Sequence, residues 1–166
     1  MNDYLPTVFD RLTEPEFRNG QGRFTFAEME ARVFRDLEDL LNTRRAGPEL
    51  FEHLPAVERS VVNYGLRDLS HTNAASPEER QAYADHVRDT IEAFDPRLTE
   101  VGVSVRDLSD DERKAMKGAF RNTTMYFRVS ATLRLGQGVA QPVVFDTLFD
   151  AAGLGRHTVT AAGEGA

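Results

Sequence analysis

Two acidic side chains in the middle of the chain, Glu92 and Asp95, have the residue type and spacing used to hydrolyse a glycosidic bond. Glycoside hydrolases use a pair of carboxyl groups roughly 5 to 9.5 Å apart, one as an acid and the other as a nucleophile or base. The neighbouring sequence indicates neither a cleft nor an apolar wall that would raise the pKa of one carboxyl group for acid catalysis. A lysozyme-like glycoside hydrolase is therefore an alternative only, and we expect no catalytic residues.

The tripeptide that follows gives Asp95 a second kind of chemistry. Pro96 has no amide hydrogen for a helix and disfavours helical backbone at Asp95, so the preceding helix must end here. Asp95 and Arg97 then flank a rigid turn as a carboxylate and a planar guanidinium. Such a pair suits a bidentate contact, either between the two residues or with a partner protein. Taken alone, the turn is better explained as a helix stop with two solvated charges.

Other residues that could carry chemistry are scattered. His53, His71, His86 and His157 lie in different segments without a second ligand at metal spacing, which favours surface or packing roles. The sequence shows no phosphate-binding glycine loop, nucleophile elbow or dinucleotide fingerprint, and Gly136–Gly138 is typical of a hairpin turn. The absence of cysteine excludes disulfides and thiolate chemistry. We expect no metal, no cofactor and no small-molecule substrate.

Composition limits the remaining classes of function. The 166 residues are 40% hydrophobic, enough for one core, and carry a formal charge of −7. A net negative charge argues against nucleic acid or an anionic membrane as the main partner. The sequence has no signal peptide or membrane span, so we expect a cytoplasmic protein. We predict an N-terminal segment with a flexible connection at 1–24, one domain at 25–160 and a frayed tail at 161–166.

The first half of the chain has helical periodicity. A short helix is predicted over Leu5–Leu12, capped by Thr7, and Thr13–Arg23 reads as a mobile connection. Thr25 and Glu28 form a capping box that opens a long helix. Its apolar stripe and its charged face, which we interpret as solvated, continue until just before Gly47-Pro48. The charged face carries Arg32, Arg35, Asp36, Glu38, Asp39, Arg44 and Arg45, the last two in the final turn.

Two more helices complete this half. After Pro55, a shorter helical run is predicted with Val57, Val61 and Tyr64 in line, and Gly65 suits a left-handed residue at its end. Arg67–Ala75 is predicted to be a loop. Ser76-Pro77-Glu78-Glu79 then combines an N-cap, a first-turn proline and a capping glutamate. The helix that begins there leads directly into Asp95.

The second half alternates with a period of two, which indicates strands. Val101, Val103 and Val105 form the first strand, and Met125–Leu135 forms the longest. A long charged loop, Asp107–Arg121, separates them. Val143–Phe149 is predicted to be a third strand, with a short fourth around His157–Thr160. Helices followed by an antiparallel meander define an α+β fold, with N-terminal helices packed on a mainly antiparallel sheet of three to four strands.

Four phrases in this order resemble the TssE family, the type VI secretion baseplate wedge proteins. That family is related to the small lysozyme-like wedge protein of contractile-tailed phage baseplates. The N-terminal segment with Asp10-Arg11-Leu12 fits the family as well, so the resemblance covers nearly the whole chain. The phrases are Arg35–Arg45, Ser60–Leu66, Phe94–Leu98 and Val144–Thr147.

The resemblance implies an assembly role. A TssE-like protein is expected to bind other wedge subunits of the TssF and TssG kind beneath the first sheath ring and to catalyse nothing. The family's tripeptide Glu-Pro-Arg maps onto Asp95, Pro96 and Arg97. The aspartate here keeps the charge but reaches one methylene less, so its contact must lie nearer or be looser.

The residue types at the family's motif positions and in the two neighbouring phrases are also suited to docking a partner protein. Planar donors and amphipathic rings anchor interfaces, and a sheet edge offers backbone groups for strand addition. We expect Arg97 to be a functional contact with a partner and not a contact that stabilises the fold. Packing and capping remain the alternative role, above all for Asn63 and Tyr64, and a soluble regulator that sequesters one partner remains the alternative function. The expected partner-binding residues are Asp95, Pro96, Arg97, Arg44, Arg45, Asn63 and Tyr64.

Overall fold

The computed structural model describes residue 4 and residues 8–15, 22–45, 54–58, 60–67, 76–107, 124–135, 138–150 and 156–161. Several predicted features therefore lie outside the described residues. They are the Thr7 cap, most of the connection over 13–23, the loop after Arg67, most of the loop over 107–121, the first two residues of the Gly136–Gly138 turn, His53, His71 and nearly all of the tail.

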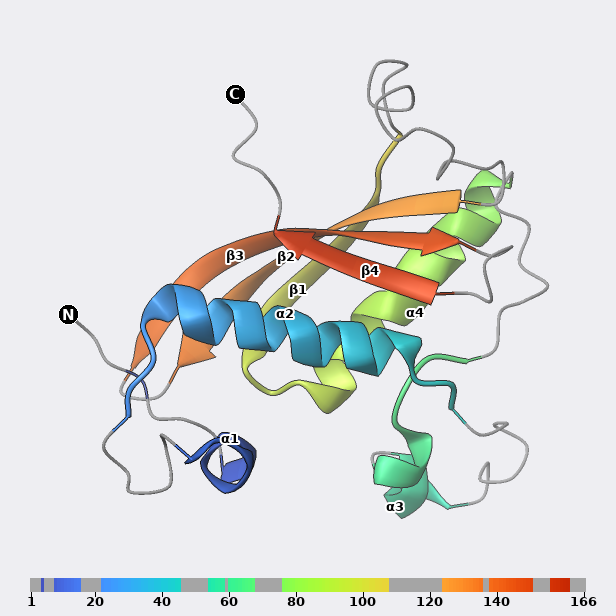
Figure 1. Cartoon of the computed structure of the whole chain (residues 1–166). Coiled ribbons are helices and arrows are strands. Elements are labelled where there is room, and N and C mark those ends of the chain that lie inside the picture. The colour runs from blue at the N-terminus through green and yellow to red at the C-terminus, as the bar shows by residue number, and fades with distance from the viewer. Residues whose placement is uncertain are drawn as a thin grey trace.

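The second half of the chain forms one four-stranded antiparallel sheet. Its strands are β1 (Leu98–Val105), β2 (Thr124–Leu135), β3 (Val139–Asp150) and β4 (Arg156–Ala161), and they lie side by side in the order of the sequence. Since helices precede this meander, the α+β prediction is confirmed. The strands β1 and β4 form the two edges of the sheet, as Figure 1 shows.

Two helices cover one face of the sheet and enclose the core. The helix α2 (Phe26–Asn42) packs against β4, and α4 (Pro77–Phe94) packs against β1 (Figure 1). Apart from a bulge in β1, alternate residues of the strands point at the helices, which matches the period of two in the sequence. The largest fully buried apolar side chains are Phe127, Phe145, Leu37, Ile91, Met125 and Leu133.

Both predicted helix starts are present. In α2 the Thr25 hydroxyl accepts from the Glu28 amide, and the Glu28 carboxylate accepts from the Thr25 amide at 2.8 Å, which closes the capping box. In α4 the Ser76 hydroxyl accepts from the Glu79 amide, and Pro77 occupies the first helical position. These bonds satisfy amide groups that have no partner within the helix.

The helix α2 ends several residues earlier than the sequence predicts. The helix ends at Asn42, and Thr43 takes an extended backbone, because the chain leaves the helix to pair with Leu66. The Arg45 amide donates to the Leu66 carbonyl at 2.8 Å, and the Leu66 amide donates to the Thr43 carbonyl at 2.9 Å. Arg44 and Arg45 therefore lie beyond the helix and not in its last turn.

The short helical run after Pro55 is also broken. It consists of α3 (Pro55–Glu58) and a separate 3-10 turn, η3 (Val61–Asn63). Val61 is 87% exposed, so the predicted stripe is not buried there. Gly65 has the expected positive φ of 107°, for a further reason: a Cβ at this position would lie 2.1 Å from the Thr43 carbonyl oxygen.

The strand β1 begins at Leu98, three residues before the predicted alternation. Its register with β2 shifts between Thr99 and Gly102, and Glu100 there has a φ of 56°. This bulge explains why the period of two is clear only from Val101 onward, because an extra residue interrupts the alternation before it. Val101 is buried, as predicted.

The edge strand β4 is tied to α2 by a side-chain amide. Asn42 accepts from the His157 backbone N–H at 2.7 Å and donates to the His157 carbonyl at 2.9 Å. It thus forms the two bonds that a neighbouring strand would form. The His157 side chain is fully buried and contacts the Tyr83 hydroxyl through Nε2 at 2.7 Å and the Thr147 hydroxyl through Nδ1 at 3.0 Å.

Candidate functional site

The candidate site is built around the corner where α4 ends and β1 begins. The Asp95 amide still donates to the Ile91 carbonyl at 2.9 Å, and the Leu98 amide donates back to the Asp95 carbonyl at 3.1 Å. Pro96 lies in the resulting turn and is exposed, whereas Asp95 is only 5% exposed. The Arg97 carbonyl accepts from the Arg134 amide at 2.7 Å, which joins the corner to the sheet.

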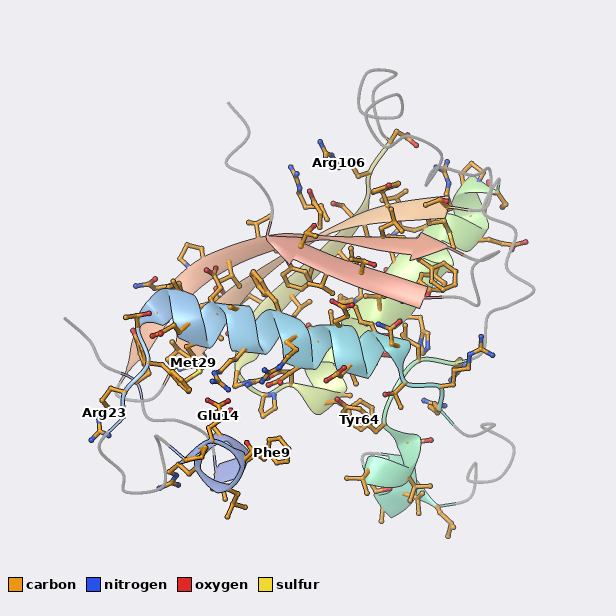
Figure 2. The ribbon with its side chains drawn as sticks, in the orientation of Figure 1. Phe9, Glu14, Arg23, Met29, Tyr64 and Arg106 are labelled. Carbon is orange, nitrogen blue, oxygen red and sulfur yellow. The ribbon has the colours of Figure 1, made fainter. Side chains whose placement is uncertain are left out.

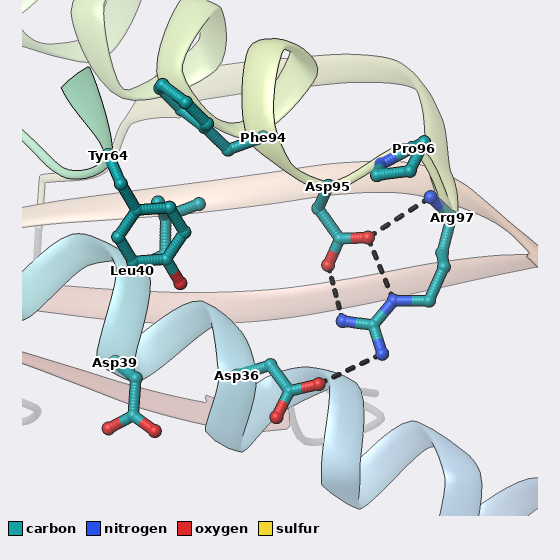
Figure 3. Close-up of a pocket in the computed structure, with 8 residues that line it drawn as sticks. All are labelled: Asp36, Asp39, Leu40, Tyr64, Phe94, Asp95, Pro96 and Arg97. Atoms are coloured by element: carbon teal, nitrogen blue, oxygen red, sulfur yellow. Dashed lines mark hydrogen bonds and ion pairs between the residues drawn. The ribbon is translucent and has the colours of Figure 1, made fainter. Parts of the chain in front are cut away.

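Arg97 holds this corner against α2. Its Nε donates to Asp95 Oδ1 at 2.9 Å and its Nη2 donates to Asp95 Oδ2 at 2.7 Å, while Nη1 pairs with Asp36 Oδ2 at 2.9 Å (Figure 3). Of the two roles open to the Asp95 and Arg97 pair, the bidentate contact between them is therefore present. The hydrogen bond and charge of Asp95, followed by those of Asp36, raise the pKa of Arg97 although burial opposes them.

A cavity of about 350 Å³ opens beside this ion pair. Residues from three regions converge on it: the middle of α2, the corner, and Tyr64 just after η3, as the close-up in Figure 3 shows. The Tyr64 and Phe94 rings meet edge to face with centroids 5.5 Å apart. The lining residues are Asp36, Asp39, Leu40, Tyr64, Phe94, Asp95, Pro96 and Arg97.

The electrostatic character of the cavity shows at Tyr64. Burial raises the pKa of the Tyr64 hydroxyl, and the negative charges of Asp36, Asp39 and Asp95 raise it further. Arg97 is the cation that opposes them. The Tyr64 hydroxyl therefore lies in a predominantly negative environment.

The structure brings together four of the seven predicted site residues: Asp95, Pro96, Arg97 and Tyr64 all line the cavity. The other three lie outside its lining. Arg44 is exposed and Arg45 half-buried where the chain pairs with Leu66, and Asn63 is 3% exposed within η3.

The sequence interpretation missed the contribution of α2. Asp36, Asp39 and Leu40 line the cavity, yet the two aspartates were assigned to a solvated face. Their spacing of three residues, next to a core leucine, does indicate a common edge of the helix. Nothing in that spacing identifies the corner of α4 as the opposite wall.

The paired carboxyl groups considered for glycoside hydrolysis do not form a site. Asp95 is buried with both of its oxygens engaged by Arg97, whereas Glu92 is exposed and is not part of the cavity lining. This cavity therefore does not place the two groups around one substrate position. Within the described ranges, no group of three or more His, Cys, Asp or Glu residues could hold a metal ion, and no helix is long and apolar enough to cross a membrane.

Ion pairs made by Arg32 attach the N-terminal helix α1 (Val8–Thr13) to α2. Arg32 pairs with Asp10 and, at 2.9 Å, with Glu14, and it lies over the Phe24 ring at 4.2 Å from the centroid. Figure 2 shows Glu14 between α1 and α2 and Phe9 projecting from α1. The apolar residues of this helix, Val8, Phe9 and Leu12, are exposed, with Phe9 at 71%.

Comparison with known proteins assigns the chain to a family. The comparison with curated proteins finds no match. Among solved structures, a chain of "The baseplate complex from the type VI secretion system" aligns over 74% of this chain and 94% of its own length, with 17% sequence identity and a TM-score of 0.47. The family model of the baseplate wedge protein gp25 matches residues 27–137, about two thirds of the chain, including the whole cavity lining. The chain therefore belongs to the baseplate wedge protein gp25 family.

Proposed function

We propose that the protein is a structural baseplate component of a contractile injection machine, the type VI secretion apparatus. There it binds other wedge subunits of the TssF and TssG kind and helps to seed the sheath. The observation that carries the proposal is the match to the wedge family across α2, the corner and β2. The resemblance to TssE in the four sequence phrases supports the choice of secretion apparatus. We place this assembly in the cytoplasm, at the membrane only through the assembled machine.

The corner and its cavity are the proposed docking site for a wedge subunit. Asp95, Pro96, Arg97 and Tyr64 lie on one concave surface, and the ion pairs hold Arg97 in place before a partner arrives. A side chain already ordered in the free protein loses little conformational entropy on binding. Exposed Arg44 and half-buried Arg45 are proposed as a second contact, and buried Asn63 as a support of η3.

The sheet edge is the proposed contact for the sheath. The outer strands of a meander offer backbone groups for strand addition by an extended arm, although on β4 the His157 N–H and carbonyl already pair with Asn42. The contact with Asn42 shows which backbone amides of β4 point away from β3. Because the His157 N–H is directed at Asn42, the Val159 N–H two residues later also points outward.

Copurification tests the proposal. The tagged full-length chain is purified from cells that express the complete apparatus, and the bound chains are identified. Recovery of large baseplate subunits in fixed proportion is the expected result. Recovery of a single signalling protein would instead support the sequestering regulator, and the proposed assembly role would then be wrong.

A further inference from the structure

The cavity beside the corner contains more negative than positive charge. Asp36, Asp39 and Asp95 contribute carboxylates to its lining, and Arg97 contributes the one guanidinium. Arg97 is already committed to Asp95 through two bonds and to a single oxygen of Asp36. Asp39 forms no ion pair with any of the residues that the structure describes, and Figure 3 shows its carboxylate apart from the Arg97 cluster.

The rest of the lining is apolar and partly aromatic. Leu40 is buried, and the edge-to-face pair of Tyr64 and Phe94 forms a wall opposite the aspartates of α2. An apolar wall beside carboxylates suits a side chain that combines a hydrophobic stem with a cationic head. Arginine fits best, because its planar guanidinium both stacks on aromatic rings and forks onto carboxylates.

We propose that the cavity receives an arginine side chain of a partner wedge subunit, with its guanidinium on Asp39 and the second oxygen of Asp36. The arginine stem lies against Tyr64 and Phe94. The inference rests on the proposed function, since the partner is a wedge subunit. Arg97 is then the cation that the protein itself supplies, and the remaining carboxylate oxygens can bind a second cation from the partner. The raised pKa of Tyr64, due to burial and then to Asp36 and Asp39, agrees with a site that favours positive charge.

A titration of the free protein tests the cavity without any wedge subunit. N-acetyl-arginine amide is added to the isotope-labelled full-length chain, and the NMR shifts of Leu40, Tyr64 and Phe94 are followed. The control ligand is N-acetyl-citrulline amide, which has nearly the same shape but no charge. We expect saturable shifts with the arginine derivative at millimolar concentration and several-fold smaller shifts with citrulline. Equal shifts with the two compounds, or none with either, would overturn the inference.

Matched variants connect the titration to assembly. Asp39→Asn and Glu92→Gln each remove one negative charge, and both positions are exposed, but only Asp39 lines the cavity. We expect Asp39→Asn to weaken wedge binding about tenfold, and more at low salt, while Glu92→Gln leaves it unchanged. If wedge binding survives in Asp39→Asn, the arginine site is wrong and the proposed function stands. If the wild-type chain binds no wedge subunit, the proposed function fails and the arginine cannot come from a wedge subunit, whereas the titration still decides whether the cavity binds arginine.

Discussion

Arg97 is the residue at which the requirements of the fold and of the proposed interface meet. The sequence predicts that it contacts a partner and does not stabilise the fold, because Pro96 makes the backbone beside it rigid. The structure gives it a clear internal role as well: its side chain is 29% exposed and neutralises Asp95, whose side chain is 7% exposed. A buried carboxylate that loses its cation keeps the full cost of its desolvation.

Removal of the Arg97 side chain is therefore predicted to affect stability. Arg97→Ala should lower the free energy of unfolding by about 2 kcal/mol, because Asp95 is left buried without its partner. Arg97→Lys should recover only part of this loss, since an ammonium cannot form the two parallel bonds. Urea denaturation of the two variants provides the measurement.

Wedge binding is measured on the same proteins, and Asp95→Glu, which restores the residue usual in the family, serves as the control. Loss of binding in Arg97→Lys beyond its loss of stability would show a contact with the partner. Unchanged stability in Arg97→Ala would contradict the internal role.

The buried His157 makes stability depend on pH. Burial lowers the pKa of His157 to about 3 from 6.5. As the pH falls below 6.5, the unfolded chain binds a proton that the folded chain excludes, so stability is lost between pH 6.5 and 3. Between pH 7 and pH 5 the protonation of this single group in the unfolded chain should lower the free energy of unfolding by about 2 kcal/mol.

His157→Gln isolates this contribution because glutamine does not titrate. The wild-type chain should lose more free energy of unfolding than His157→Gln between pH 7 and pH 5, by about the amount above. Denaturation curves at the two pH values give the difference. Parallel losses in both proteins would mean that His157 is protonated without unfolding.

At the scale of elements, charge and not apolar burial attaches α1 to the body. Its apolar side chains Val8, Phe9 and Leu12 are exposed, whereas Asp10 is buried against Arg32. A six-residue helix cannot persist without such a contact.

Arg32→Ala is therefore predicted to release α1 while leaving the sheet and the two long helices folded. Hydrogen exchange of residues 10–14 should become faster by about tenfold, since the ion pairs with Asp10 and Glu14 are lost. Exchange in the core strands should hardly change. Arg35→Ala, at an exposed position of the same helix, is the control and should leave α1 protected. Equal exchange in Arg32→Ala and the wild type would show that α1 is held by other contacts.

The edge strand β4 allows a sharper test of strand addition. Val159→Pro removes an amide that points away from β3, so the fold should tolerate it, whereas Thr158→Pro removes a bond to β3 and should destabilise the strand. We expect the folded Val159→Pro protein to join the wedge complex but to fail to start sheath polymerisation. Electron microscopy of the sheaths is the readout, and normal sheath growth would exclude the β4 edge.

For the molecule as a whole, the main alternative to assembly is hydrolysis. Glu92 is exposed and does not line the cavity at the corner, and Asp95 is bound by Arg97, so we predict that the purified protein does not cleave peptidoglycan. The assay is release of soluble fragments from purified cell walls, with a known lysozyme as positive control. Activity that disappears in Glu92→Gln or Asp95→Asn would establish the enzyme and refute the structural role.

Much of the fold is predictable because its signals are local. Capping at Thr25 and Ser76, the alternation of β2 and the proline at 96 each act within a few residues, and the structure confirms all four. The α+β class follows from their order along the chain. Half of the residues that line the candidate site could be predicted for the same reason, because the corner is formed by consecutive residues.

What only the tertiary structure decided lies at long range. Asn42 ends α2 and meets His157 across 115 positions, and Asp36 meets Arg97 from a different helix. Patterns in the sequence report which face of an element is apolar, but they do not report which polar residue another element will bring to that face. For that reason Asp36 and Asp39 read as solvated charges in the sequence. The packing of α2 beside α4 and η3 turned them into the wall of a cavity, because a helix face acquires its partner only when the chain closes around it.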